Sequence, residues 1–413
     1  MKRKIVFLLV LMLCVVIGLC SFGCASETKK QQEEPEEGLQ FALTADGAGY
    51  NVAGRGTVEG GVIEIPSLHE GLPVTGIAAR AFDRDGELTS VSISEGVTAI
   101  GDGAFNNCTA LTSVSMPTSL RSIGIGAFEL CTALVSVDVP EGVTEIKEFA
   151  FGSCSALTDI GVPSSLERLG SEVHSASLCI GDAVFSGCKS LEYNEFDNAL
   201  YLGNTANPYV LLMRAKSKDI ESCTINENTK VIYEYAFQNC SALSGVVIPD
   251  SVKQIGYKAF SSSGVASVTI GSGVKEIRDS AFLSCKSLTG VVVPDGVEIV
   301  GDGAFGMCSA LTTVSIGNGV REIGIMAFGD CAVLAKVTFG NGLELIGVSA
   351  FYLCPALTEA HFASTEGWRA CLPSFSFDDV SADPIPLDPS ALASSTTAAE
   401  YLRETYRDRY FVK

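Results

Sequence analysis

Short segments in which hydrophobic and polar residues alternate recur along most of this chain. In residues 304–324, Val314 and Ile316 fall on one side of an extended backbone, and Thr313 and Ser315 fall on the other. This period of two predicts a short strand with one buried face. A Pro or Gly commonly follows the strand. Because Pro lacks an N–H and Gly allows positive φ, either residue ends a strand and turns the chain.

The alternating segments belong to a repeat that is marked by phenylalanine. Most copies carry an Ala-Phe pair, and successive Phe residues mostly lie 22 or 23 residues apart. One unit cannot bury its apolar residues alone, whereas stacked units share a continuous core. The pattern therefore predicts a β-rich solenoid of short parallel strands over residues 80–362. Its copies carry Phe82, Phe105, Phe128, Phe151, Phe185, Phe237, Phe260, Phe282, Phe305, Phe328 and Phe351.

Cysteine occupies a fixed position in the repeat, three residues after the phenylalanine. Equivalent positions in stacked turns have parallel side chains, whereas a disulfide needs Cβ atoms that face each other. We therefore expect a ladder of buried free thiols. No CxxC pair or nearby histidine gives the ladder the pattern of a metal site. The ladder comprises Cys108, Cys131, Cys154, Cys188, Cys240, Cys285, Cys308, Cys331 and Cys354.

The N-terminus predicts export. Residues 1–23 have a positively charged start and an apolar stretch, Ile5–Leu19, that suits a signal peptide better than a membrane span. The tetrapeptide that ends at Cys24 resembles a bacterial lipobox, which implies lipidation of Cys24 and a membrane-anchored lipoprotein on the cell surface. Ordinary cleavage after Ala25, which would give a secreted protein, is the alternative. The remainder of residues 24–38 is polar, so we expect a flexible linker.

The repeat is interrupted by an irregular insertion near residues 166–234. About 11 extra residues leave the regular turn near Glu167–Ser177, and 52 residues separate Phe185 from Phe237. Insertions in solenoids form loops on one face, which often bind partners. The alternative interpretation is a β-hairpin that only joins two stacks of turns. The candidate partner-binding residues in the insertion are Tyr201, Asn204, Asn207, Tyr209 and Arg214.

Both ends of the repeat array require a cover. Residues 39–79 are expected to form an N-terminal capping unit, and residues 363–413 a C-terminal cap. Thr397 to Glu400 has the pattern of a capping box, which predicts the start of a short amphipathic helix. The apolar stripe of that helix would comprise Leu402, Tyr406 and Tyr410.

Charge and composition exclude several classes of function. The formal net charge is −20, so phosphate backbones and anionic membranes repel the chain. We expect no nucleic-acid partner, and membrane contact only through the N-terminal lipid anchor. The three histidines lie far apart, and no GxxxxGK[ST], HExxH or GxSxG motif is present. The sequence therefore predicts a non-enzyme without catalytic residues, cofactor or metal.

The repeat resembles the BspA-like class of leucine-rich repeats found on bacterial surface proteins. Gly49–Val52, Ile65–Ser67 and Gly71–Val74 are similar to the N-terminal unit of that class. Ala199–Asn204 and Asn207–Tyr209 are similar to an insertion that recurs in it. The resemblance implies a leucine-rich-repeat solenoid that is right-handed and curved, with a short parallel sheet on one face. It also implies adhesion to proteins of a host or a neighbouring cell.

The strand surface available to a partner consists of small and mostly neutral residues. Pairs such as Ser113/Ser115 and Thr313/Ser315 point outward, without the Trp, Tyr and Arg that commonly anchor tight interfaces. We therefore expect many weak contacts to an extended or multivalent extracellular protein ligand. A cell-wall or carbohydrate-binding module is the alternative function, although few outward aromatic rings are available for stacking on sugars.

Overall fold

The computed structural model describes residues 38–170, 184–371, 385–405 and 408–413. The predicted signal peptide, Cys24 and nearly all of the predicted linker lie outside these residues. Most of the extra residues near Glu167–Ser177, and Tyr406 of the predicted helical stripe, also lie outside them.

Each turn of the repeat contains one strand of mostly three or four residues and one strand of two residues. In the strand Thr313–Ile316, Val314 and Ile316 are buried, whereas the side chain of Thr313 is exposed. The N–H of Phe305 donates to the carbonyl of Ala327 in the next turn at 2.7 Å. The predicted alternation is therefore confirmed, and backbone hydrogen bonds join each turn to the next.

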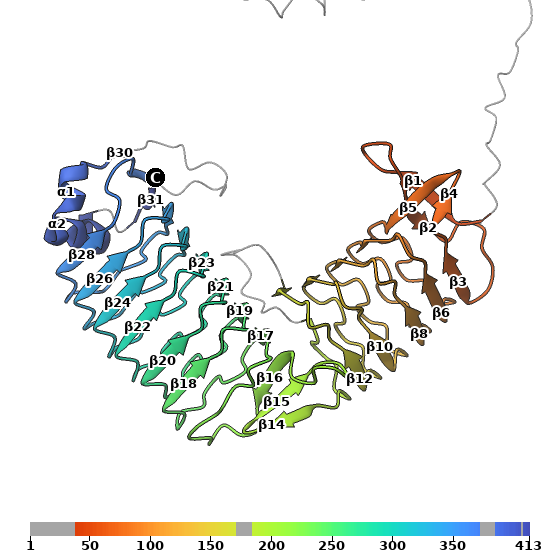
Figure 1. The fold of residues 1–413 in the computed structure, drawn as a ribbon, viewed down its shortest axis with the longest axis horizontal. Helices are drawn as coiled ribbons and strands as arrows, with labels where there is room; N and C mark the ends of the chain where they lie inside the picture. The colour runs from red at the N-terminus through yellow and green to blue at the C-terminus, as the bar shows by residue number, and fades with distance from the viewer. Residues whose placement is uncertain (1–37, 171–183, 372–384, 406–407) are drawn as a thin grey trace, which may run out of the picture. The chain divides into compact units, whose positions relative to one another are not determined.

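The longer strands pair in parallel along one side of the stack, and Figure 1 shows β18 to β28 as successive arrows. We call the solvent-exposed side of these strands the long-strand face. Its strands are β3 (Val62–Ile65), β6 (Ser90–Ile93), β8 (Ser113–Ser115), β10 (Ser136–Asp138), β12 (Asp159–Gly161), β18 (Gly245–Ile248), β20 (Ser267–Ile270), β22 (Gly290–Val293), β24 (Thr313–Ile316), β26 (Lys336–Phe339) and β28 (Glu359–Phe362).

The two-residue strands form parallel ladders in a second row, which we call the short-strand face. One ladder stops at β13 and a second begins in the insertion, so the row is interrupted where the repeat is irregular. Its strands are β7 (Ala99–Ile100), β9 (Ser122–Ile123), β11 (Glu145–Ile146), β13 (Arg168–Leu169), β17 (Val231–Ile232), β19 (Gln254–Ile255), β21 (Glu276–Ile277), β23 (Ile299–Val300), β25 (Glu322–Ile323) and β27 (Leu345–Ile346).

The repeat phenylalanines stack ring on ring through the core. The Phe305 ring lies 5.1 Å from that of Phe282 and 5.4 Å from that of Phe328, and the planes are within 2° of parallel. This spacing follows from strand pairing, which separates neighbouring turns by about 4.8 Å. The stack is broken after Phe185, where Tyr233 tilts by 51° against it. Two separate hydrophobic clusters result, one on each side of the break.

The insertion joins these two stacks with an antiparallel unit. Its strands β14 (Asn194–Phe196), β15 (Ala199–Leu202) and β16 (Leu211–Ala215) pair in that order, and β16 then pairs in parallel with β17. Gly203 forms a parallel bridge with Gly161 at the end of β12. A side chain at Gly203 would collide with the carbonyl oxygen of Asn207, so this connection needs glycine.

The N-terminal capping unit covers the first turn with an antiparallel hairpin. The ring of His69 stacks on Phe41 at 3.7 Å, and the Tyr50 hydroxyl donates to Glu70 at 2.8 Å. Its strands are β1 (Gln40–Leu43), β2 (Tyr50–Gly54), β4 (Leu68–His69) and β5 (Leu72–Ile77).

The C-terminal cap is helical in part, as expected, but two details of its prediction are wrong. Thr397 lies inside α2 (Ser395–Glu400), whose N-cap is Ser394, so the predicted capping box does not start the helix. Tyr410 lies in a strand, β31 (Tyr410–Val412), because the chain leaves its helical path and pairs antiparallel with β27 and with β29 (Arg369–Cys371), where Tyr410 lies opposite Cys371. The other elements of the cap are β30 (Ile385–Pro386), α1 (Pro389–Ala393) and a π-helical turn (Tyr401–Thr405).

Candidate functional site

The long-strand face presents small side chains in register, as the sequence predicts. The hydroxyl of Ser113 lies 2.9 Å from that of Ser90, and Thr338 donates to Ser315 at 3.2 Å. These bonds join equivalent positions of neighbouring strands. Val247 and Val292 add exposed apolar side chains, and Lys336 of β26 pairs with Glu359 of β28 at 3.2 Å. The face is therefore extended and mostly neutral.

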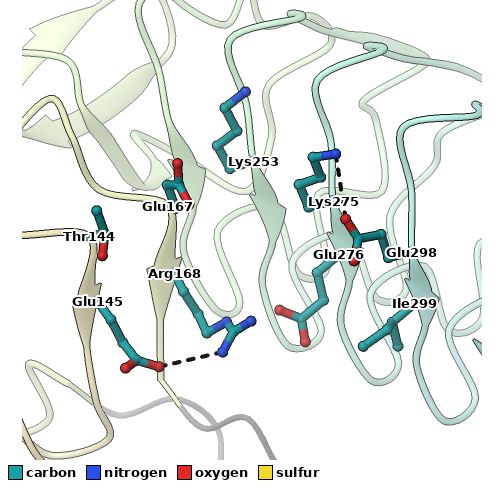
Figure 2. A pocket seen from close by; sticks show the side chains of 9 residues that line it. All are labelled: Thr144, Glu145, Glu167, Arg168, Lys253, Lys275, Glu276, Glu298 and Ile299. Carbon is teal, nitrogen blue, oxygen red and sulfur yellow. Dashed lines mark ion pairs between the residues drawn. The ribbon is translucent and has the colours of Figure 1, made fainter. Parts of the chain in front are cut away.

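The short-strand face is charged. A hollow of about 370 Å³ spans both stacks on this face, and Figure 2 shows the acidic and basic side chains that line it. Arg168 pairs with Glu145 at 3.5 Å, and Lys275 pairs with Glu298 at 3.5 Å. Opposite charges thus offset one another here, and the hollow has no strong preference for an anion or a cation.

A glutamine side chain bridges the interruption in the short-strand face. Gln254 is buried, and its amide nitrogen donates to the carbonyl of Leu169 at 3.0 Å. Its amide oxygen accepts the Leu169 N–H at 2.9 Å. The side chain therefore supplies the hydrogen bonds that a neighbouring strand would give to β13, and it satisfies two buried backbone groups.

Three of the predicted partner-binding residues have their side chains engaged within the fold. Tyr201 is fully buried, and its hydroxyl accepts the N–H of Asn226 at 3.4 Å. The Asn204 amide donates at 2.9 Å to Glu141 and to the carbonyl of Val162, both in the first stack. Burial raises the pKa of Tyr201.

Asn207 likewise donates from its side chain to the carbonyl of Asn228 at 3.1 Å. Contacts of this kind are expected where an insertion only joins two stacks of turns, which is the alternative interpretation of this insertion. Partner binding by these asparagines stays a prediction.

The other two predicted residues are Tyr209 and Arg214. Tyr209 is partly buried, and its ring packs against Tyr201 at 5.5 Å. Arg214 is exposed, and its guanidinium lies over the ring of Tyr193 at 5.4 Å from the centroid. Burial raises the pKa of Tyr193, and the charge of Arg214 opposes that rise. Arg214 also lines a large hollow.

That hollow, which we call the basic groove, lies where the first stack ends and has a volume of about 860 Å³. Its rim carries four cationic side chains, and Glu234 is the acidic residue among those that line it. Sequence reasoning missed Lys189, because this residue belongs to a regular repeat and approaches Arg214 only through the fold. The rim is formed by Lys189, Arg214, Lys216 and Lys218.

The thiol ladder is buried and free of disulfides among the described residues, as expected. Most rungs donate to the backbone of the preceding turn: the thiol of Cys308 lies 3.3 Å from the carbonyl oxygen of Phe282. The N–H of Cys285 donates to the same carbonyl at 3.2 Å, so both of its lone pairs are used. Burial raises the pKa of Cys108 to about 12, and this thiol is therefore a poor nucleophile.

The described part of the chain lacks two further features. It contains no group of three or more His, Cys, Asp or Glu side chains that could hold a metal ion. Its helices also include none with the length and apolarity needed to cross a membrane.

The stacked parallel strands, the phenylalanine spine and the two capping units together define a leucine-rich-repeat solenoid. The chain matches the family model described as BspA type leucine rich repeat region over residues 75–202, 174–289, 214–331 and 275–366. These matches span well over half of the sequence, so the protein belongs to the BspA-type leucine-rich-repeat family. Proteins of this family are typically bacterial surface proteins.

Several solved structures are similar to this chain. A leucine rich cell surface protein of Faecalibacterium prausnitzii is 25 % identical, with a TM-score of 0.32, over 81 % of this chain and 95 % of that one. A leucine-rich repeat protein of Bacteroides ovatus is 23 % identical, with a TM-score of 0.32, over 80 % and 94 %. The leucine-rich repeat protein of T. pallidum is 23 % identical, with a TM-score of 0.30, over 79 % and 91 %. A search of curated proteins found no match.

Proposed function

We propose that this protein is a non-enzymatic adhesin or scaffold that binds other proteins at the bacterial cell surface. Its family membership supports a surface location. The observation that carries the proposal is the long-strand face, which repeats solvent-exposed positions in fixed register on one turn after another. Such a surface provides many small contacts along an extended partner, and many weak contacts together give strong attachment.

We also propose that the chain is held at the membrane through lipid attached to Cys24. The polar residues that follow Cys24 support this proposal, since they contain no aliphatic run that could pack into a core. A linker of this kind would hold the solenoid away from the membrane. The lipid would then be the protein's contact with the bilayer.

The function is tested by attachment of whole cells. Cells with the gene and matched cells without it are compared on surfaces coated with extracellular-matrix protein or with purified cell-wall polysaccharide. We expect the gene to increase attachment to protein and to leave attachment to polysaccharide unchanged. Increased attachment to polysaccharide alone would favour the carbohydrate-binding alternative, and equal attachment of both strains to every surface would contradict both functions.

A further inference from the structure

The basic groove exposes a part of the core that every regular turn covers. In a regular turn, the ring of a repeat phenylalanine such as Phe128 is fully buried, because the next phenylalanine stacks on it. Phe185 has only the tilted Tyr233 beyond it, and the two side chains are 6 % and 8 % exposed. Leu191 and Met213 add further apolar surface with 7 % exposure each. The floor of the basic groove is therefore apolar, and it is covered slightly less completely than the core of a regular turn.

The rim above this floor is positive in a chain that is strongly negative. Four cationic side chains and one carboxylate line the basic groove, which gives 4 − 1 = +3, against −20 for the whole chain. Glu195 partly offsets this charge, because it pairs with Lys216 at 2.8 Å. Lys189 and Lys218 have no ion-pair partner among the described residues. Both lysines are exposed, so their charges are available to a ligand.

An aromatic platform lies beside the cations. Tyr193 and Tyr235 are partly buried and line the basic groove, and Arg214 covers the ring of Tyr193. Tyr235 adopts a positive φ of 56°, a strained conformation for a residue with a side chain. Burial raises the pKa of Tyr235 to about 12, and its hydroxyl is already engaged in a side-chain hydrogen bond with Tyr257.

We infer that the basic groove binds an acidic segment of a protein partner, with carboxylates on the rim and one apolar side chain against the floor. The volume of about 860 Å³ is sufficient for a few side chains. Unpaired lysines above an apolar floor are complementary to a segment in which Asp or Glu flank Phe or Leu. This inference rests on the proposed function and names the part of the partner that the solenoid recognises.

The first test measures peptide binding to the purified full chain by fluorescence anisotropy. The probe is a labelled peptide in which Asp and Glu flank a single Phe. Two control peptides replace Phe with Ser, or the acids with Asn and Gln. We expect the acidic Phe peptide to bind at low salt, each control peptide to bind about tenfold more weakly, and affinity to fall as salt is added. Equal binding of the three peptides would overturn the inference.

The second test locates the site with a matched pair of variants. Lys189→Glu with Lys218→Glu reverses two rim charges and is expected to weaken binding of the acidic peptide by at least about tenfold. Lys286→Glu is the control, because Lys286 follows Cys285 as Lys189 follows Cys188 and is exposed in the same way. We expect a change of less than about twofold for Lys286→Glu, since exposed charges are screened beyond about 10 Å.

Four further outcomes would overturn the inference. Binding that survives the double charge reversal would place the peptide elsewhere, and equal loss in the Lys286→Glu control would reveal only a long-range charge effect. Dextran sulfate that binds the rim while the peptide does not would show a site for polyanions. Cells that carry the double variant and still attach to protein-coated surfaces would exclude the basic groove and leave the proposed function intact.

Discussion

The free energy of unfolding is expected to fall by at least about 3 kcal/mol per pH unit above about pH 10, because buried thiols resist ionisation in the folded chain. Burial raises the pKa of Cys108 from 9.0 to about 12 and that of Cys285 from 9.0 to about 11. Each thiol therefore stabilises the fold fully below pH 9, and its contribution is lost as the pH rises toward the pKa that the thiol has in the folded chain. Two thiols at about 1.4 kcal/mol per pH unit give the expected slope.

The measurement is urea denaturation under reducing conditions at pH 8, 9, 10 and 11. The control variant is Cys108→Ser with Cys285→Ser, since Ser263 already occupies one position of the ladder. Lysine and tyrosine groups titrate in both proteins, so the difference between the two slopes isolates the thiols. A variant that loses stability with pH as steeply as the wild type would show that these thiols ionise normally in the folded chain.

Replacement of Gln254 by Leu is expected to cost about 2–5 kcal/mol and to uncouple the two stacks. Leucine has a similar size but leaves the N–H and the carbonyl of Leu169 buried without partners, at about 1–3 kcal/mol for each group. Each stack has its own hydrophobic cluster, so weak coupling lets the two unfold in separate steps.

The check is thermal and urea unfolding of the full chain, with Gln238→Leu as a control at a partly exposed glutamine of the second stack. We expect one transition in the wild type and in the control, and two transitions in the Gln254→Leu variant. A midpoint and a transition shape unchanged by Gln254→Leu would mean that the contact with Leu169 does not hold the stacks together.

The regular part of the fold could be predicted from sequence because the repeat fixes its own register. A spacing of 22 or 23 residues stacks each phenylalanine ring on that of the preceding turn. The same spacing places Cys308 beside the carbonyl of Phe282. The outward positions of the strands follow from the period of two. No information from distant parts of the chain is needed for any of these features.

The joint between the stacks could not be predicted in the same way. Gln254 occupies an ordinary position of its repeat, and only the fold brings it to Leu169, which is 85 residues away. Tyr201 was selected as a binding residue for its aromatic ring, yet that ring fills the core of the joint. The basic groove combines Lys189 of a regular turn with Arg214 of the insertion, a pairing without a local sequence signal.

The central claim is that this solenoid is exported and held at the cell surface to bind protein partners. Mass spectrometry of the mature N-terminus, on protein recovered from the native cell envelope, tests the display of the solenoid most directly. The account predicts a chain that begins with a diacylglyceryl-modified Cys24. A chain that begins with an unmodified Ser26 would make the protein secreted, and an intact Met1 on protein found only inside the cell would contradict surface display.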